Sequence, residues 1–249
     1  MANTVEFDAS YPSVDYTALP EDELESFHTA DGKLHLFNNI GCPFGHRALW
    51  TAIEVNAPFQ VVEVSLANKP PSFTEKFNRY GTVPYVLDNG FAVYESAIVA
   101  QYLDVKYGEG QLHRVKDVQA ASIAQLAAAK FEVRPFFAYL RSGNEEAEKE
   151  VKAALDELET IFRVHAKAYR DQGPYLLGAE LSSAEINIVP FLYRFDLVLR
   201  HFRKHDLLAG HPLIKAAFEA VKARPTFQKT VAADEFYIQA FSKFVTPAP

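Results

Sequence analysis

The sequence predicts a small α/β domain followed by a larger all-helical domain, and two observations support this prediction. Before residue 108, short strand-like runs and helical runs follow one another, which is the pattern of an α/β unit. From about residue 117 onward, apolar residues recur only at helical spacing, and residues 108–116 (GEGQLHRVK) read as the linker. With 249 residues and 49% hydrophobic content, the chain is long enough to bury the cores of both domains.

The elements of the α/β domain follow from local patterns. Alternating or β-branched runs predict strands, and a proline at the first helical position opens the first helix. Asn-Gly between two apolar runs predicts a β-hairpin. In order, we expect a strand at 33–37, a helix at 43–56, a strand at 59–64, helical turns at 73–79, strands at 82–87 and 91–94, and a helix at 95–107. In the second domain we expect helices at 118–141, 145–170, 183–203, 211–223 and 232–244.

The charge is concentrated at the N-terminus. Residues 1–31 hold eight acidic residues and no lysine or arginine, so the rest of the chain has 24 acids against 25 bases. We expect residues 1–31 to form an acidic, solvated N-terminal extension, followed by an α/β domain at 32–108 and the helical domain at 117–244. The near-neutral remainder gives no indication of nucleic-acid binding.

Composition also bounds the location of the chain. The sequence has no run of about 20 apolar residues for a membrane span, and its first residues lack the pattern of a secretory signal. The single cysteine cannot form an intrachain disulfide, which suits a reducing compartment. We therefore expect a cytoplasmic protein that does not associate with a membrane.

Cys42, within the run GCPF, is the candidate nucleophile. It lies where a predicted strand gives way to a helix, and a helix N-terminus lowers a cysteine pKa from ~8.5 into the range of about 3.5–7.5. Arg47, one turn further, would add to the positive field. The alternative is a packed structural thiol, because free cysteine is among the most buried residue types. A reactive Cys42 has no second cysteine to resolve a mixed disulfide, so an outside thiol must do so.

Short motifs in both domains carry a family resemblance. They are CPF and Arg47 (42–47), NKP (68–70), VP (83–84), YES (94–96) and RPTFQKT (224–230). In this order the chain resembles the cytosolic glutathione transferases over about residues 32–244, most closely the cysteine-type omega class. The resemblance implies a thioredoxin-like N-terminal domain, an all-helical C-terminal domain and a homodimer.

The resemblance also implies the site residues. Cys42 would be catalytic and Arg47 would tune its thiolate, while the glutathione-binding residues would be Phe44, Lys69, Val83, Pro84, Glu95 and Ser96. The N-terminus of the helix expected at 95–107, with the Ser96 hydroxyl, would bind the γ-glutamyl carboxylate, and Glu95 would pair with the α-ammonium. Val83 would hold the cysteinyl portion through its backbone, and Lys69 would meet the glycyl carboxylate. From the residues alone, Ser96 is equally well an N-cap, and Pro84 is either cis or a trans residue at a strand start.

This cysteine chemistry predicts a glutathione-dependent thiol transferase or reductase. Glutathione is the expected cosubstrate, no metal is required, and dehydroascorbate or small glutathione adducts are the expected acceptors. A conjugating transferase toward aromatic electrophiles is an alternative, although residues 37–42 (FNNIGC) lack the serine or tyrosine of those classes. Two further alternatives are a non-catalytic interaction module and a relative of the chloride intracellular channel proteins. The chloride intracellular channel proteins lack the Glu-Ser pair that this chain has.

Aromatic residues in the helical domain are candidates for the acceptor pocket. They are Phe131, Phe136, Phe137, Tyr139 and Tyr193, with Phe44 nearby, although aromatics on a bundle helix mostly belong to the core.

Other features favour structural roles or depart from the family pattern. Ser182 and Glu185 predict a capping box. His201 and His205 have metal-ligand spacing, but the bases between them favour a solvated helix face. Gly45 and His46 depart from the omega pattern, and His46 would influence the thiolate if it lay beside Cys42.

Overall fold

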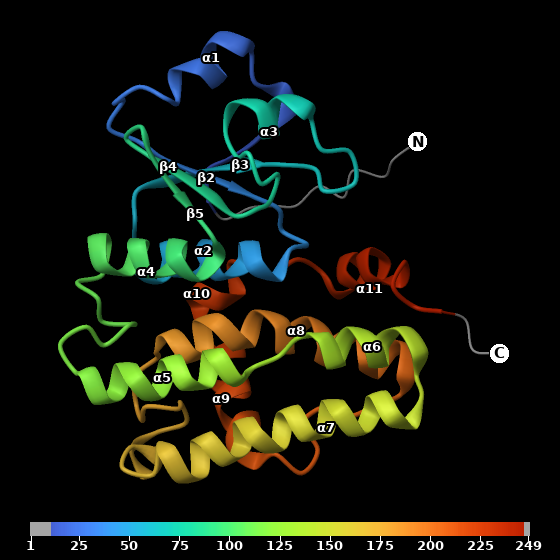
Figure 1. Cartoon of the computed structure of the whole chain (residues 1–249). Coiled ribbons are helices and arrows are strands. Elements are labelled where there is room, and N and C mark those ends of the chain that lie inside the picture. Colours follow the sequence, from blue (N-terminus) through green and yellow to red (C-terminus); the bar gives the residue numbers. More distant parts are fainter. Residues whose placement is uncertain (1–10, 247–249) are drawn as a thin grey trace. The chain divides into compact units, whose positions relative to one another are not determined.

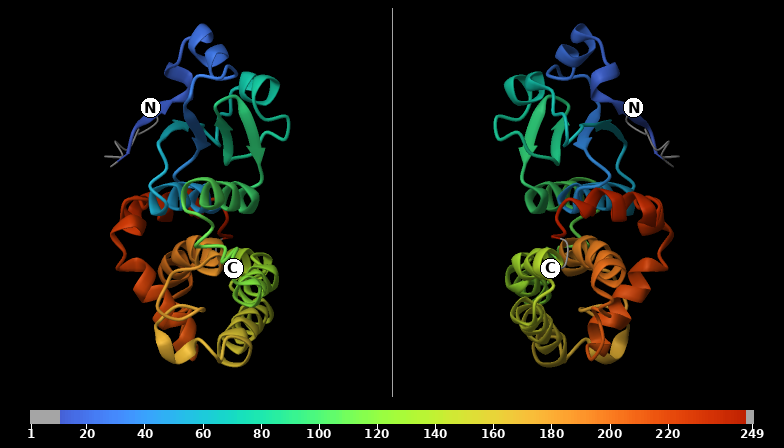
Figure 2. Two further views of the ribbon diagram at one scale, coloured as in Figure 1. Left: turned by 90° about the vertical axis from the view of Figure 1, so that its left-hand side faces the viewer. Right: turned by 90° about the vertical axis from the view of Figure 1, so that its right-hand side faces the viewer.

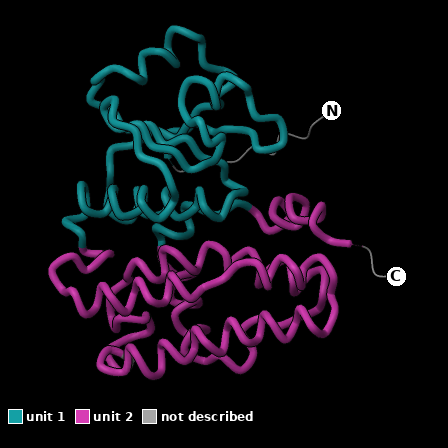
Figure 3. The backbone as a smooth tube through the Cα atoms, viewed as in Figure 1, with its two compact units in different colours: residues 1–110, 225–232 teal, residues 111–224, 233–249 magenta. Residues whose placement is uncertain are grey.

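The structure, a computed structural model, describes residues 11–246 apart from the side chain of Arg170. The chain divides into two compact units (Figure 3). The first contains the described residues up to Gly110 together with 225–232, and the second contains 111–224 together with the described residues from Ala233 onward. The predicted α/β and all-helical parts are confirmed, and residues 225–232 are a late segment that returns to the first unit.

Among the described residues of the first unit, five strands form one mixed sheet in the order β1-β3-β2-β4-β5 (Figure 1). The strands are β1 (Ser13–Asp15), β2 (Leu34–Asn38), β3 (Phe59–Glu63), β4 (Tyr85–Asp88) and β5 (Phe91–Tyr94). β1 and β2 run parallel to β3, whereas β4 is antiparallel to β2 and to β5. Asn89 and Gly90 both have positive φ, which is the backbone that a two-residue hairpin turn of this twist requires, so the predicted hairpin is confirmed.

Helices cover both faces of this sheet. They are α1 (Glu21–Ser26), α2 (Pro43–Glu54), α3 (Pro71–Lys76) and α4 (Ser96–Tyr107). α2 and α4 lie side by side against one face, and α1 and α3 lie on the other (Figures 1 and 2). Leu36 and Phe37 are adjacent in β2 and are fully buried in two different cores, one on each face. This alternation is why a strand covered on both sides reads as continuously apolar.

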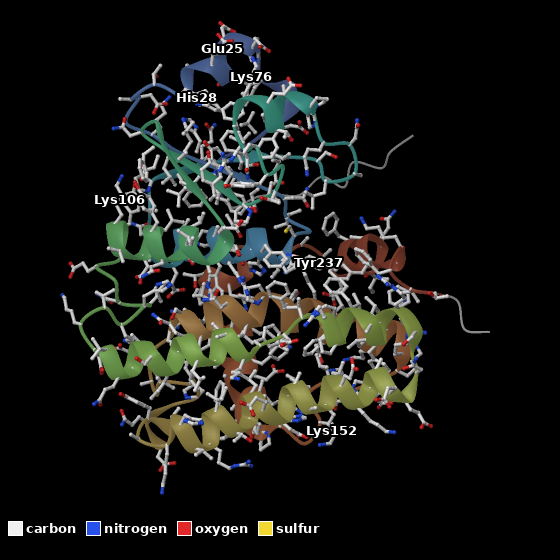
Figure 4. The ribbon with its side chains drawn as sticks, viewed as in Figure 1. Glu25, His28, Lys76, Lys106, Lys152 and Tyr237 are labelled. Carbon is white, nitrogen blue, oxygen red and sulfur yellow. The ribbon has the colours of Figure 1, made fainter. Side chains whose placement is uncertain are left out.

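The N-terminal segment differs from the expected solvated extension. Its strand β1 adds to the sheet, and Tyr16, Leu24 and Phe27 are buried in the core beneath α1 and α3. Lys76 of α3 forms ion pairs with two of the acids in α1, one of them Glu25 at 3.5 Å (Figure 4). Residues 11–31 therefore belong to the α/β unit, because the burial of their aromatic and leucine side chains in its core holds them there despite their many acidic residues. Residues Glu6 and Asp8, also counted in the extension, lie outside the described residues.

The second unit consists of helices. They are α5 (Val118–Lys130), α6 (Arg134–Ser142), α7 (Glu145–Thr160) with a π-helical continuation (Ile161–His165), a 3₁₀ turn (Arg170–Gln172), α8 (Ser183–Arg203), α9 (Pro212–Lys222) and α11 (Asp234–Ser242). The short α10 (Pro225–Gln228) belongs to the first unit. The helix expected at 118–141 is two helices, because the chain is extended at Phe131 and Pro135 lies in the first turn of α6, which begins at Arg134.

α8 begins with the predicted capping box, in which Ser182 caps the N-terminus and Glu185 accepts from the backbone N–H of Ser182. Further along this helix, Arg194 is fully buried and its guanidinium lies 4.7 Å from the ring centre of Tyr237 in α11. Within residues 11–246, no helix is both long and apolar enough to cross a bilayer.

Candidate active site

Cys42 occupies the N-cap position of α2, after the turn that follows β2. Pro43 supplies the first helical residue, whose missing N–H costs nothing there and whose φ suits the helix. The backbone N–H of His46 donates to the carbonyl oxygen of Cys42 at 2.9 Å, which closes the first helical turn. The thiol is half-buried, and its Sγ lies 3.9 Å from the carbonyl oxygen of Val83. The position is that of a thiol at the positive end of a helix dipole.

A cavity of about 160 Å³ lies in the first unit near this thiol. Its lining residues are Phe44, Thr82, Val83, Pro84, Glu95 and Ser96. Five of them were predicted from the sequence, and Thr82 was not. The available signal for Thr82 was its position directly before the Val-Pro pair. Its carbonyl accepts a hydrogen bond from the side-chain amide of Asn78 at 2.8 Å, which holds this wall of the cavity.

The Val83–Pro84 peptide bond is cis, which decides between the two possibilities that the sequence left open. β4 begins after it, at Tyr85. The carbonyl of Val83 therefore lies outside the strand ladder, on the side of Cys42.

Glu95 and Ser96, at the N-terminus of α4, also line the cavity. Glu95 is the N-cap residue and has φ +66°, a region that non-glycine residues rarely adopt. Such backbone strain is concentrated at functional sites. Ser96 is the first residue of α4, is buried and lines the cavity, which therefore lies at the N-terminus of a helix, where the first backbone N–H groups have no intrahelical partner. Together with the Ser96 hydroxyl, these N–H groups are suited to bind a carboxylate.

Arg47 contacts two of the residues that line the cavity. Its guanidinium donates to the Ser96 hydroxyl at 3.0 Å and lies 5.4 Å from the ring centre of Phe44. Burial lowers the pKa of Arg47 to about 10, while the negative charge of Cys42 acts in the opposite direction. Arg47 is therefore still cationic at neutral pH and is electrostatically coupled to Cys42 as well as bonded to Ser96.

Lys69 is not among the residues that line the cavity. Its ammonium donates to the backbone carbonyl of Gly81, the residue before Thr82. It is half-buried at the edge of the site and supports the loop that leads to Val83.

The two departures from the omega pattern have structural explanations. The side chain of His46 is buried and bonds to Thr230 Oγ1, so it is directed toward the 225–232 segment. Gly45 packs against Asn38, and a Cβ at Gly45 would lie 2.1 Å from the Asn38 side-chain oxygen. Only glycine fits there beside Asn38.

The aromatic residues proposed for an acceptor pocket belong mostly to the core of the helical unit. Phe131, Phe136 and Tyr139 are buried. Phe137 packs edge-on against Phe195. Tyr193 is half-buried against the edge of the Tyr237 ring, and burial raises its pKa to about 12.

The helical unit does contain a larger cavity, of about 450 Å³, between α7 and the connection from α8 to α9. It is lined by charged, histidine and aliphatic side chains, and none of the aromatic residues proposed above lines it. His205 pairs there with Glu148. Within residues 11–246, no group of histidine, cysteine and acidic side chains is arranged to hold a metal ion.

Comparisons with known proteins match both halves of the chain. The glutathione S-transferase N-terminal domain matches residues 32–105, and the C-terminal domain matches 122–230. A curated relative, "Glutathione S-transferase DHAR3, chloroplastic" of Arabidopsis thaliana, is 30% identical over 199 residues, which are 80% of this chain and 72% of that protein. The chain therefore belongs to the glutathione S-transferase family.

Solved structures agree with this assignment. The trimeric glutathione transferase TDR1 of Leishmania has a TM-score of 0.79 at 27% identity, with 92% of this chain covered; the chain spans about half (51%) of that longer one. Glutathione transferase Omega 3C of Trametes versicolor has a TM-score of 0.71 at 25% identity, covering 90% of this chain and 94% of that one.

Proposed function

We propose that this chain is a glutathione-dependent thiol transferase or reductase that uses Cys42 as its nucleophile. The observation that carries the proposal is the place of the only cysteine of the chain, at the N-cap of α2 and in contact with Val83 on the wall of the cavity. A plant DHAR-type transferase among the relatives and an omega-class structural neighbour support the same chemistry.

The proposed cycle uses one cysteine and two molecules of glutathione. The Cys42 thiolate attacks the glutathione sulfur of a mixed disulfide, a Cys42–glutathione disulfide forms, and the acceptor leaves as a thiolate. A second glutathione thiolate then attacks this disulfide, which releases oxidised glutathione and restores the Cys42 thiolate. With dehydroascorbate as the acceptor, two glutathione molecules supply the two electrons and are released as one disulfide.

Glutathione would bind along the cavity with its γ-glutamyl end at the start of α4. Its α-carboxylate would accept from the Ser96 hydroxyl and the helix N-terminus, with Arg47 adding positive charge. Glu95, which is exposed, would pair with the α-ammonium. Val83 would bond the cysteinyl backbone, and Lys69 would be close to the glycyl end.

We also propose a homodimer and a cytoplasmic location. Phe91 on the edge strand β5 is exposed and stacks on Tyr102, and Ile98 and Val105 of α4 are exposed beside it. An apolar strip of this kind is typical of a protein interface. Light scattering of the wild-type chain and of the Ile98→Asp variant tests the dimer; a monomeric wild type would exclude it.

The cytoplasmic location is tested separately, by imaging the tagged full chain in the cells that produce it. Confinement to an organelle would contradict the proposal.

The proposed function is tested by the reactivity of Cys42. The rate of alkylation by a thiol-selective reagent is measured from pH 4 to 9, and mass spectrometry follows the adduct formed with oxidised glutathione. We expect rapid alkylation below pH 7.5 and a single glutathione adduct on Cys42. Cys42→Ser is the control and should form neither product. A thiol that reacts only after denaturation would refute the mechanism and favour a non-catalytic interaction module.

A further inference from the structure

Residues 225–232 lie between two stretches of the helical unit in sequence but pack on α2, the helix that has Cys42 at its N-cap. This segment contains α10 and belongs to the first unit, where α10 lies against α2 (Figures 1 and 3). It comprises most of the RPTFQKT run. None of the glutathione-binding roles proposed above involves this run.

A buried hydrogen bond joins the segment to the first turn of α2. His46 Nε2 and Thr230 Oγ1 lie 2.5 Å apart, and both residues are almost fully buried. The same Thr230 hydroxyl donates its hydrogen to the carbonyl oxygen of Phe227 at 2.5 Å. Because a hydroxyl has one hydrogen, Thr230 must accept from His46, so the imidazole carries its proton on Nε2. The bond therefore fixes the tautomer of His46 as well as its direction.

Two more contacts continue along the same face of α2. The Trp50 ring meets Phe227 edge-on with centroids 5.0 Å apart, and the Thr226 hydroxyl donates to the Glu54 carboxylate near the C-terminal end of the helix. His46, Trp50 and Glu54 are spaced four residues apart, so they follow one face of the helix. The segment thus runs along α2 from its first turn to its last.

The first of these contacts is made by His46, whose backbone bonds to Cys42. The backbone N–H of His46 donates to the carbonyl oxygen of Cys42, and that bond defines the first turn of α2. The His46 side chain is held at its far end by Thr230 and against its face by Phe227, with ring centroids 4.9 Å apart. A shift of His46 therefore moves the peptide that orients Cys42.

We propose that His46 and Thr230 form a positioning pair for Cys42, through which the 225–232 segment fixes the first turn of α2 and the direction of the thiol. The pair does not touch substrate; it acts through the His46-to-Cys42 backbone bond. This inference deepens the thiol mechanism and rests on it for its consequence in turnover. The geometry of the pair itself can be tested without glutathione.

The segment provides a matched set of variants. Thr230→Val keeps the shape and removes the hydroxyl, and Thr230→Ser restores the hydroxyl. Thr226→Val makes the same hydroxyl-to-methyl change in the same segment, but at the other end of α2. The readouts are the alkylation rate of Cys42 as a function of pH, kcat and KM for glutathione-dependent thiol transfer, and the thermal midpoint.

We expect Thr230→Val to slow alkylation at pH 7 by about tenfold and to lower kcat with little change in KM, since small misplacements of a reacting group are costly. Thr230→Ser and Thr226→Val should stay within about twofold of the wild type, whatever their thermal midpoints. Equal losses in Thr230→Val and Thr226→Val would overturn the proposal and assign the effect to general docking of the segment. Wild-type reactivity in a folded Thr230→Val variant would overturn it as well.

A measurement on the unmodified chain keeps the test independent of variant folding. Nitrogen NMR of the histidine rings should show His46 as the Nε2–H tautomer with a slowly exchanging proton. An Nδ1–H tautomer would overturn the proposed pair. If Cys42 alkylates readily but no glutathione adduct forms, the thiol-transfer function fails, and the alkylation rates of the Thr230 variants still decide for or against the positioning pair.

Discussion

Replacing Glu63 by glutamine should make the α/β unit more stable at high pH. Glu63 ends β3, and its carboxylate accepts from the backbone N–H of Ile40 in the turn before Cys42. The pKa of Glu63 is raised from 4.5 to about 7: burial is the main cause, the bond from Ile40 acts in the opposite direction, and the neighbouring charge of Asp15 in β1 adds to the rise. The folded chain therefore holds a proton on Glu63 at pH values where the unfolded chain has lost it.

The sign and magnitude follow from this difference. A carboxyl with a raised pKa contributes its full stability below about pH 4.5 and loses it as the pH rises to about 7. At 1.36 kcal/mol for each pKa unit, the total loss is about 3 kcal/mol. Glutamine keeps an oxygen for Ile40 and does not ionise. The free energy of unfolding of Glu63→Gln, relative to the wild type, should therefore rise by about 2.5 kcal/mol between pH 5 and pH 8.

The assay is urea unfolding followed by the fluorescence of Trp50, the only tryptophan of the chain, which is fully buried in α2 of the same unit. Glu23→Gln, an exposed acid of α1, is the control and should show no such trend. Asp15→Asn should reduce the pH dependence of the wild type, because it removes the charge that raises the Glu63 pKa. A constant difference between Glu63→Gln and the wild type from pH 5 to pH 8 would refute the reasoning.

Three further predictions concern packing and capping. Gly45→Ala should cost about 1–3 kcal/mol in urea unfolding, because its Cβ would lie 2.1 Å from the Asn38 oxygen; the double variant with Asn38→Ala should recover most of the loss, and no recovery would contradict the steric explanation. Ser182→Ala should lower the free energy of unfolding by about 1 kcal/mol through loss of the N-cap, whereas Ser122→Ala, within α5, should change it by less than about 0.5 kcal/mol. Leu24→Ala should cost about 2–4 kcal/mol if the N-terminal segment is part of the core, and a neutral result would restore the solvated extension.

Local patterns determined most of the elements of the first unit. Asn89-Gly90 marked the hairpin, and Pro43 with the spaced apolar residues after it marked α2. These features depend on neighbours in sequence, through backbone sterics and helical periodicity, so they can be predicted without a tertiary structure. The same holds for the capping box at Ser182, whose partners lie within one helical turn.

Structural features that depend on residues distant in sequence were predicted less well. The acidic composition of residues 11–31 suggested a solvated segment, but Tyr16 and Leu24 reach a core formed by residues much later in the chain. Similarly, the aromatic run around Phe136 fitted either a pocket or a core, and the packing of the helical unit places Phe136 in the core. Composition cannot decide such cases, because burial depends on which surfaces meet.

The sequence by itself determined the chemistry that is available, namely one cysteine at a helix start and a Glu-Ser pair at another, both within an α/β unit. Only the tertiary structure showed that Arg47 bonds to Ser96 and that Thr230 bonds to His46. The latter two residues are 184 positions apart. A hydrogen bond between side chains so distant in sequence leaves no periodicity or spacing to detect, since it exists only once the chain has brought α2 and the 225–232 segment together.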